Sequence, residues 1–325
     1  MTLPALDDLL DGSVCFAVPL TVRFRGTDVR EGLLVRGPMG WGEFAPFPEY
    51  GPAECSRWLA AAIEAAWTGW PAPLRDTVPV NAIIPAVEPD VASRLTRESG
   101  CTTVKVKVAD AGQSLADDVA RVAAVRAALG PAGSVRIDAN GAWTFDEAVD
   151  ALRELEPLGL EYAEQPCPTI EECAQLRRVV DVPLAIDEGV RRAGDPRAVV
   201  GLREAADVLV LKVPPLGGVG AALRVAEAYG LPCVVSSALD TSVGLAAGLA
   251  LAAALPELPY ACGLASGLLL ADDVVTDRLL PVAGALGVRR PSVDRAVVST
   301  SAPVDGWNRW RSRLAEAHGV LSRRS

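Results

Sequence analysis

The chain has 325 residues, half of them hydrophobic, a formal net charge of −10 and a pI near 4.8. Nucleic acids and anionic membranes need a basic face, so this balance argues against either as the main partner. The length allows one large domain or two smaller ones, with enough apolar residues for a sizeable core.

Cysteine usage and the apolar runs indicate the compartment. The seven cysteines are an odd number without a CxxC pair, which favours buried free thiols in a reducing cytoplasm. The N-terminus lacks the basic start of a secretory signal. The longest apolar run, "VGLAAGLALAAAL" from Val243, is too short to span a bilayer and predicts a buried helix.

The single histidine, His318, lies close to the C-terminus. Its position argues against a Ser-His-Asp or Cys-His catalytic pair, and one imidazole cannot form a multi-histidine zinc site. Acid–base chemistry is therefore expected from Lys, Asp, Glu, Tyr or Cys. Any metal is expected on carboxylates, which favours Mg²⁺ or Mn²⁺.

The first part of the chain, residues 1–77, is expected to form an α+β unit with antiparallel strands. The segments "VCFAVPLTVRF" and "REGLLVRG" are typical of strands, and a helix is predicted from Pro52 to about Trp67. Residues 291–325, with Trp307 and Trp310, are expected to pack back on this unit.

From Val78 onward, short apolar runs alternate with amphipathic helices. One helix is predicted between Ser114 as N-cap, with Asp117 three residues later, and Gly130, and another after Thr144. Eight repeats favour a closed parallel (β/α) barrel, with an open doubly wound sheet as the alternative. The eight predicted strands are "VPVNAIIPA", "TVKVKVA", "SVRIDAN", "LEYAEQP", "VPLAIDE", "ADVLVLKV", "PCVVSSA" and "YACGLAS".

The segment "TTVKVKVAD" at residues 102–110 alternates valine with lysine, which predicts a strand with two different sides. Lys105 and Lys107 then point to the same side. Ammonium groups are costly inside a buried parallel sheet, so this side is expected to face compensating charges.

Polar residues recur at the C-terminal ends of the predicted strands, where a barrel has its active site. Residues far apart in the sequence are therefore expected to meet at one mouth. They are Lys105, Lys107, Asp138, Asn140, Glu164, Asp187, Glu188, Lys212, Ser236 and Ser237.

Asp138, Glu164 and Asp187 follow three successive strands. Without a cation, three buried carboxylates would repel one another strongly, and their oxygen atoms suit Mg²⁺. These three residues are therefore the predicted metal ligands. Asn140 is expected either to bind a ligand or to form a turn. Glu188 is expected to point away from Asp187 and to support the ligands from behind.

Lys212 follows the sixth strand, nearly across the barrel from Lys105 and Lys107. With a metal ion between them, these lysines would place an acid–base group on each face of a substrate. A buried lysine beside another cation has a lowered pKa and can act as a base. The alternative is a set of structural ion pairs between the lysines and the carboxylates.

Five motifs occur in order on the expected strands: "KVKV", "IDANGAW", "EYAEQP", "AIDEG" and "LVLKVPPLGG". They resemble the enolase superfamily, in its branch with paired barrel lysines, over essentially the whole chain. Within it, "TVRFRGTDVREGLLVRG", "GWGEFAPFPEY" and "VVSSALDTSVGL" are most similar to o-succinylbenzoate synthases of the actinobacterial type. The resemblance implies a modified TIM-type barrel of residues 78–290. It also implies an α+β capping domain of residues 1–77, joined by 291–325.

The resemblance also implies a carbon–oxygen lyase. It would dehydrate a small molecule, 2-succinyl-6-hydroxy-cyclohexadiene carboxylate, to o-succinylbenzoate in menaquinone biosynthesis. Lys107 would take the proton next to the carboxylate, and Lys105 would lower the pKa of Lys107 and help hold the carboxylate. Lys212 would stabilise the enediolate, and the three acidic residues would bind Mg²⁺.

Donors for the second carboxylate of the substrate are expected nearby, with ordinary loop roles as the alternative. The candidates are Ser236, Ser237, Gly217 and Gly218, together with Arg23 and Arg25 from the predicted cap.

Other functions stay open. An N-acylamino acid racemase or a dipeptide epimerase would use the same metal and lysines, and a non-catalytic barrel would only bind a ligand. A metal-dependent aldolase is disfavoured because it usually uses histidine ligands. The sequence does not indicate the oligomeric state.

Overall fold

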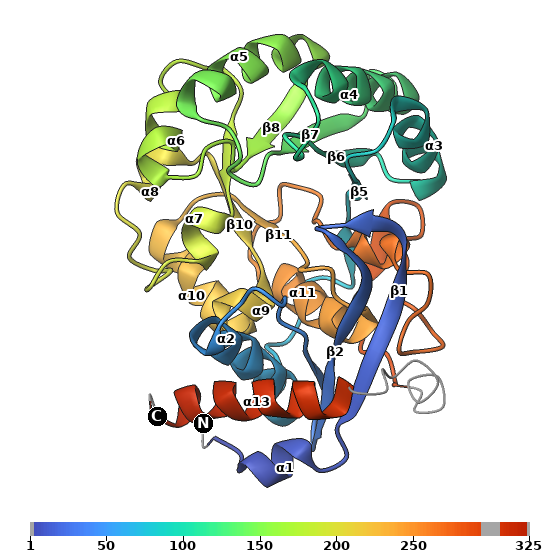
Figure 1. The fold of residues 1–325 in the computed structure, drawn as a ribbon, viewed down its shortest axis with the longest axis vertical. Coiled ribbons are helices and arrows are strands. Elements are labelled where there is room, and N and C mark those ends of the chain that lie inside the picture. The colour runs from blue at the N-terminus through green and yellow to red at the C-terminus, as the bar shows by residue number, and fades with distance from the viewer. Residues whose placement is uncertain (1–2, 294–305, 324–325) are drawn as a thin grey trace.

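The computed structural model describes residues 3–293 and 306–323. Figure 1 shows two parts, a small antiparallel sheet with its helices and a curled parallel sheet with helices around it. The predicted boundaries of 1–77, 78–290 and 291–325 stay a prediction, and residues 1–2, 294–305 and 324–325 lie outside the described residues.

The small part, called the cap below, is built on a three-stranded antiparallel sheet in the order β1-β2-β3. The C-terminal helix α13 packs along α2. Trp310 of α13 meets Phe44 edge to face, with ring centroids 6.1 Å apart. The elements are α1 (Leu6–Leu10), β1 (Val14–Phe24), β2 (Thr27–Gly37), β3 (Gly40–Phe44), α2 (Pro52–Ile63), a π-helical turn (Glu64–Thr68) and α13 (Gly306–Ser322).

The large part, called the barrel below, contains seven parallel strands in the order β11-β10-β9-β8-β7-β6-β5. Each strand lies beside the next one along the chain, as expected for repeated strand–helix units. The strands are β5 (Ala82–Ile84), β6 (Thr103–Lys107), β7 (Ser134–Asp138), β8 (Leu160–Glu164), β9 (Leu184–Ile186), β10 (Val208–Leu211) and β11 (Cys233–Val235).

Helices cover the outside of this sheet (Figure 1). The predicted N-caps of two of them are confirmed, since Ser114 and Thr144 both form capping boxes. The helices are α3 (Pro89–Ser99), α4 (Leu115–Leu129), α5 (Phe145–Leu155), α6 (Ile170–Leu176), α7 (Glu188–Arg191), α8 (Leu202–Ala205), α9 (Val213–Leu216), α10 (Val219–Tyr229) and α11 (Ser242–Ala254), with 3₁₀ turns at Glu156–Leu158 and Ala265–Leu269.

Two predicted strands differ in the structure. The eighth, "YACGLAS", is not a strand of the sheet, and isolated bridges from Cys262 to Val80 and from Gly263 to Ser236 join the two sheet edges instead. The chain enters a 3₁₀ turn at Ala265, which leaves no length for a ladder. The first predicted strand is divided, because β4 (Thr77–Pro79) pairs with β12 (Ala285–Gly287) outside the barrel sheet.

Strand alternation decides what faces the inside of the barrel. Val104 and Val106 of β6 are buried in the core that the sheet shares with its helices. Deeper in the barrel, a second cluster is formed by Tyr162, Ala185, Val208, Val210 and Val234. Below the strand ends the interior is mostly apolar, but it also holds the buried side chain of Arg136 of β7, which donates to Asn81 Oδ1 at 3.0 Å and to the carbonyl of Ala261 at 2.6 Å.

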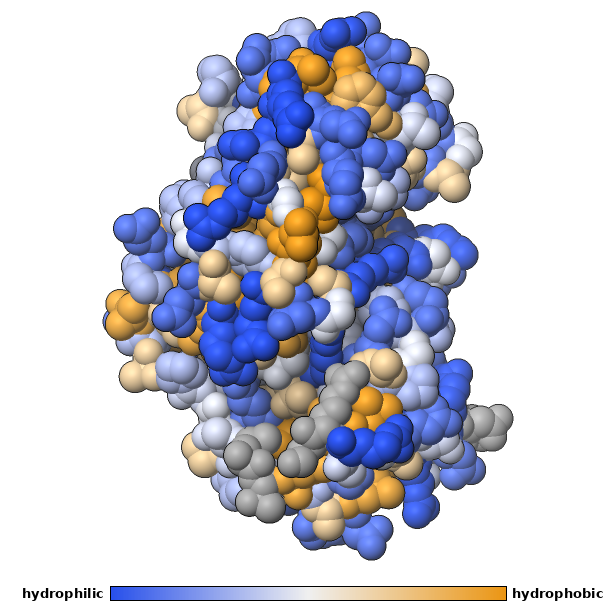
Figure 2. Space-filling model, turned by 90° about the vertical axis from the view of Figure 1, so that its left-hand side faces the viewer, coloured by the Kyte–Doolittle hydropathy of each residue, from blue (hydrophilic) through white to orange (hydrophobic). Residues whose placement is uncertain are grey.

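Polar residues cover most of the face shown in Figure 2, with apolar residues in patches between them. The predicted buried helix at Val243 is confirmed as α11, whose residues are buried almost throughout. Among the described residues, no helix has the length and apolar character needed to cross a bilayer.

Candidate active site

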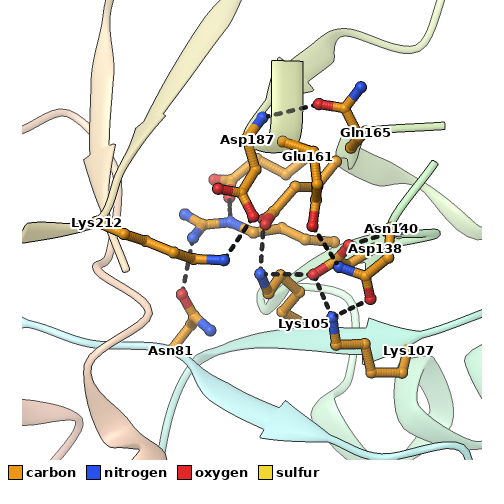
Figure 3. A network of polar contacts seen from close by, with 12 residues as sticks. Asn81, Lys105, Lys107, Asp138, Asn140, Glu161, Gln165, Asp187 and Lys212 are labelled. Carbon is orange, nitrogen blue, oxygen red and sulfur yellow. Dashed lines mark hydrogen bonds and ion pairs between the residues drawn. The ribbon is translucent and has the colours of Figure 1, made fainter. Parts of the chain in front are cut away.

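Strand β6 brings two ammonium groups to the mouth of the barrel. Lys105 Nζ lies 3.0 Å from Asp138 Oδ2 and 2.6 Å from Glu164 Oε2. Lys107 Nζ lies 2.6 Å from the same Asp138 oxygen. Both lysines therefore lie on one side of β6 and meet carboxylates from β7 and β8 (Figure 3).

Lys212, at the end of β10, reaches the carboxylates from the opposite direction (Figure 3). Its Nζ lies 2.5 Å from Asp187 Oδ2. The other oxygen of Asp187 accepts a hydrogen bond from Arg191 Nε at 2.9 Å. Arg191 also donates to Tyr50 Oη of the cap at 2.8 Å, so the cap touches this side of the site.

Burial raises the pKa of each of the three carboxyl groups, and the neighbouring charges decide the outcome. The lysines of β6 and β10 outweigh burial at Asp138 and hold its pKa well below the usual value. Arg191 and Lys212 do the same for Asp187. At Glu164, burial and the charge of Asp138 prevail and raise the pKa to about 7.

The two lysines of β6 differ in the same way. Burial lowers the pKa of Lys107, and the charges of Lys105 and Lys212 lower it further, against the opposing effect of Asp138. At Lys105, burial is outweighed by Asp138 and Glu164, which raise its pKa. Lys107 is therefore the better base and Lys105 the more permanent cation.

The three carboxylates fit a divalent metal ion in their chemistry. Asp138 and Glu164 are paired in register on β7 and β8, and Asp187 follows β9. Glu164 Oε1 is buried and has no hydrogen-bond partner, which is costly unless a cation binds it. In the described part of the chain, no three acidic, histidine or cysteine side chains enclose a metal position. In this arrangement the lysine ammonium groups supply the positive charge instead.

Glu188 is placed differently from the prediction. Its Oε1 accepts hydrogen bonds from Asn140 Nδ2 at 3.1 Å and from Arg191 Nη2 at 2.6 Å, so it faces the same network as Asp187. The reason is local: α7 begins at Glu188, and the alternation of a strand no longer applies there.

Gln165 orients the end of β9 and was not identified from the sequence. Its Oε1 accepts hydrogen bonds from the amides of Asp187 at 3.1 Å and Gly189 at 3.0 Å. Its Nε2 donates to the carbonyl of Cys167 at 2.9 Å. The signal was available, because Gln165 directly follows Glu164 in "EYAEQP".

A cavity of about 30 Å³ lies at this mouth. That is room for about one water molecule. The predicted residues that line it are Arg25, Lys105, Lys107, Asp138, Asn140, Lys212, Ser236 and Ser237. Lining residues that the sequence reasoning missed are Phe24, Ile83, Ala238, Leu239 and Ser266.

Ser266 is the most informative of the missed residues. Ser237 Oγ donates a hydrogen bond to Ser266 Oγ at 2.8 Å, and both side chains are buried. Ser266 ends the segment "YACGLAS", so the strand-end argument could have found it.

Glu164 and Asp187 do not line the cavity, although they pair with Lys105 and Lys212. Three other predicted residues lie apart from both the cavity and these ion pairs. Arg23 is exposed and pairs with Asp28 at 3.0 Å. Gly217 and Gly218 precede α10, whose first amides donate to the carboxylate of Glu64. A Cβ on Gly218 would lie 2.6 Å from Glu64 Oε2, so this glycine permits the close approach of a cap residue.

Comparison with known families agrees with this fold and this arrangement of strand ends. Residues 89–291 match the family described as enolase C-terminal domain-like, and residues 15–66 match the enolase N-terminal domain-like family. The chain belongs to the enolase superfamily. Sites of this superfamily combine a Lys or His base with a divalent metal ion.

Enolase-superfamily relatives of similar length are close in sequence. An o-succinylbenzoate synthase from Thermobifida fusca is 64% identical over 305 residues, which are 94% of this chain and 95% of the relative. One from Mycolicibacterium smegmatis is 52% identical over 98% of both chains.

Solved structures of the superfamily share the fold at low identity. An N-succinyl Arg/Lys racemase from Bacillus cereus superposes with a TM-score of 0.76 at 21% identity, over 89% of this chain and 96% of that one. The muconate lactonizing enzyme from Pseudomonas putida gives 0.75 at 20% identity, over 90% and 98%.

Proposed function

We propose that this member of the enolase superfamily is an o-succinylbenzoate synthase, a carbon–oxygen lyase of menaquinone biosynthesis in the cytoplasm. The observation that carries the proposal is the approach of lysines from two sides, Lys107 on β6 and Lys212 on β10, to one set of carboxylates. Relatives of that name at 64% and 52% identity over nearly the whole chain support it. The predicted domains, a barrel of 78–290 and a cap of 1–77 with 291–325, belong to the same proposal.

Lys107 is the proposed acid–base group. Its free amine takes the proton next to the carboxylate of the cyclohexadiene ring, and the electron pair of the broken C–H bond passes into an enediolate. That pair then forms the new ring double bond as the bond from the neighbouring carbon to its hydroxyl group breaks. The ammonium of Lys107 returns the proton to the departing hydroxide, so that water leaves and the amine is restored.

Stabilisation of the enediolate requires concentrated positive charge, because a proton next to a carboxylate is very weakly acidic. Lys105, with its raised pKa, stays a cation beside the substrate carboxylate, and Lys212 is placed to stabilise the ring of the enediolate. Asp138, Glu164 and Asp187 would hold a divalent ion, Mg²⁺ or alternatively Mn²⁺. When bound, it supplies further charge at the carboxylate.

The second carboxylate of the substrate needs donors at the other end of the cavity. Ser236, Ser237 and Ser266 line it there, and Asn140 lines the end beside Lys107. Arg25, from the turn between β1 and β2, reaches the cavity with its guanidinium over the ring of Phe47 at 4.3 Å. These contacts suit a dianionic small molecule.

The test is an assay with the purified protein, Mg²⁺ and the cyclohexadiene substrate. Loss of the diene absorbance and formation of o-succinylbenzoate, both abolished by a chelator, is the expected result. In parallel, N-succinyl amino acids are incubated in deuterated water. Rapid α-deuteration with inversion, and no turnover of the diene, would replace this proposal with the racemase.

A further inference from the structure

A second buried cluster of ionisable side chains lies between the cap and the barrel, and the proposed chemistry does not use it. Arg30 of β2 and Glu43 of β3 come from the cap, and Asp240 comes from the loop between β11 and α11. Their exposed fractions are 3%, 7% and 3%. Charged groups this deeply buried need specific partners.

Arg30 joins a barrel loop to the cap. Its Nε donates to the carbonyl of Leu239 at 2.8 Å, and Nη2 donates to the carbonyl of Ala45. The guanidinium lies over the ring of Phe47, 4.7 Å from its centroid. One side chain of the cap thus holds a backbone group of the barrel and one of the cap in a fixed relation.

The barrel loop that Arg30 holds is a wall of the active-site cavity. Ser236–Leu239 all line that cavity. Leu239 has a φ of +62°, a left-handed conformation that residues with a side chain rarely adopt. Asp240 Oδ2 accepts a hydrogen bond from the amide of Ala238 at 3.0 Å. The turn is therefore fixed from within by Asp240 and from the cap by Arg30.

We propose that Arg30 is a positioning residue for substrate binding, which holds the cavity-facing turn Ser236–Leu239 in place from the cap. The inference rests on the proposed function for the identity of the substrate. Without the guanidinium, the buried carbonyl of Leu239 loses its partner, and the left-handed backbone loses the contact that holds it. The turn Ser236–Leu239 then leaves this conformation, and the wall of the cavity that it forms changes shape.

The cap is attached to the barrel at other places that do not involve this turn. Glu64 accepts a hydrogen bond from the amide of Gly220 at 2.9 Å, at the start of α10. Arg75 donates to the carbonyls of Leu255 at 2.8 Å and Pro256 at 3.1 Å, just beyond the C-terminal end of α11. Arg75 is a matched control, because it binds backbone carbonyls at the far end of the helix that follows the turn.

The experiment compares Arg30→Met with Arg75→Met in the full chain with Mg²⁺. For Arg30→Met, we expect KM for the diene to rise about tenfold with kcat within about threefold, because the turn contacts the substrate before and during the reaction. Amide hydrogen exchange of residues 237–241 should become at least about tenfold faster. Arg75→Met should change neither quantity. Equal effects of the two variants, or an unchanged KM and exchange rate for Arg30→Met, would overturn the proposal.

A second variant keeps the test decisive if Arg30→Met does not fold. Arg30→Lys keeps the positive charge beside Glu43 and Asp240 but loses the fork that binds two carbonyls. It should still speed exchange at 237–241, and exchange at the wild-type rate would contradict the proposal. Hydrogen exchange needs no substrate, so a wild-type protein that leaves the diene unchanged rejects the synthase function alone.

Discussion

The mouth of the barrel and the interface between cap and barrel both bury carboxyl groups around a cation, yet they leave those groups in different states. At the mouth, lysines lower the pKa of Asp138, and Arg191 and Lys212 lower that of Asp187. Glu164 is the exception there, because burial and the charge of Asp138 raise its pKa to about 7. At the interface, burial and the charge of Asp240 raise the pKa of Glu43 to about 8. Burial also raises the pKa of Asp240.

These pKa values differ because the two regions place different numbers of cations beside their carboxyl groups. At the mouth, lysines from two strands and an arginine face the carboxylates. At the interface, Arg30 is the cation that acts on Glu43, and Arg30 and Lys212 act on Asp240. The donors to Glu43 include the neutral amides of Thr241 and Gly244, each at 3.1 Å. Ionised groups suit metal binding and proton transfer, whereas a group that keeps its proton suits docking. A buried ionisable side chain is therefore not by itself evidence of an active site.

The sharpest test of this comparison removes the base at the mouth. Lys107→Ala should lower kcat by about 10³-fold, since a positioned general base typically contributes 10²- to 10⁴-fold. The measurement is the steady-state rate with the diene substrate, alongside a thermal unfolding curve. Glu64→Gln, which alters a carboxylate at the cap–barrel interface away from the cavity, is the control and should keep kcat near the wild-type value.

If Lys107→Ala keeps its rate while Glu64→Gln loses it, the assignment of chemistry to the mouth and docking to the interface is wrong. The unfolding curves separate a loss of catalysis from a loss of folded protein.

Metal binding should also belong to the mouth alone. Dialysis against EDTA should abolish activity, and Mg²⁺ or Mn²⁺ should restore it. Glu164→Gln should weaken Mn²⁺ binding by more than about 100-fold, because even groups that only support metal ligands are typically worth 10- to 100-fold. Electron paramagnetic resonance of free Mn²⁺ measures this affinity without the enzyme assay. Equal Mn²⁺ affinity for Glu164→Gln and wild type would remove this residue from the proposed metal site.

The pH–rate profile tests how the mouth sets the pKa of its base. Activity requires the free amine of Lys107, so kcat/KM should fall as the pH drops below the pKa of that group, which burial and Lys105 lower. Lys105→Met removes a neighbouring cation and frees Asp138 and Glu164 to stabilise the ammonium of Lys107. The acidic limb of the residual activity should therefore move to higher pH. A limb that stays in place, or moves down, contradicts the role of Lys105.

Many residues of the mouth could be predicted because their positions follow from the alternation of side chains within single strands. Alternation in "TTVKVKVAD" places Lys105 and Lys107 on one side of β6, and the position of Asp138 at the end of β7 follows from the same alternation. The barrel then brings neighbouring strand ends together. The resemblance to the enolase superfamily added the roles.

The rule fails where a strand stops. Glu188 opens α7 rather than continuing β9, so the side predicted from alternation was wrong. The segment after Tyr260 contributes isolated bridges instead of an eighth strand.

The interface could not be predicted for a different reason. Arg30 and Leu239 are 209 positions apart in the chain, and neither lies in a periodic pattern that points to the other. The misplaced prediction for Gly218 has a similar cause. A glycine at this position could approach a substrate carboxylate, but in the structure it approaches the carboxylate of Glu64. Contacts between the cap and the barrel depend on how the two parts pack against each other. The sequence pattern of either part alone does not predict that packing.

The smallest expected effect on the reaction concerns the proton on Glu43, which is visible in the stability of the fold. Folded Glu43 keeps its proton up to about pH 8, whereas its ordinary pKa is 4.5. The folded state thus binds more protons than the unfolded state between these values, and stability falls as pH rises through that window. Glu43→Gln removes this slope. Relative to wild type, its unfolding free energy should therefore rise steadily from pH 5 to pH 8.

Urea unfolding at several pH values measures the difference, and Asp117→Asn provides a control of opposite sign. Hydrogen bonds from Ser114 lower the pKa of Asp117, so the stability that this carboxylate adds is present above pH 3.8 and is lost as the pH falls through its folded pKa. The free energy of unfolding of Asp117→Asn should therefore be lower than that of wild type by a constant amount from pH 5 to pH 8. Parallel curves for wild type and Glu43→Gln over that range would mean that Glu43 is ionised at the interface. The contrast with the carboxylates of the mouth would then disappear.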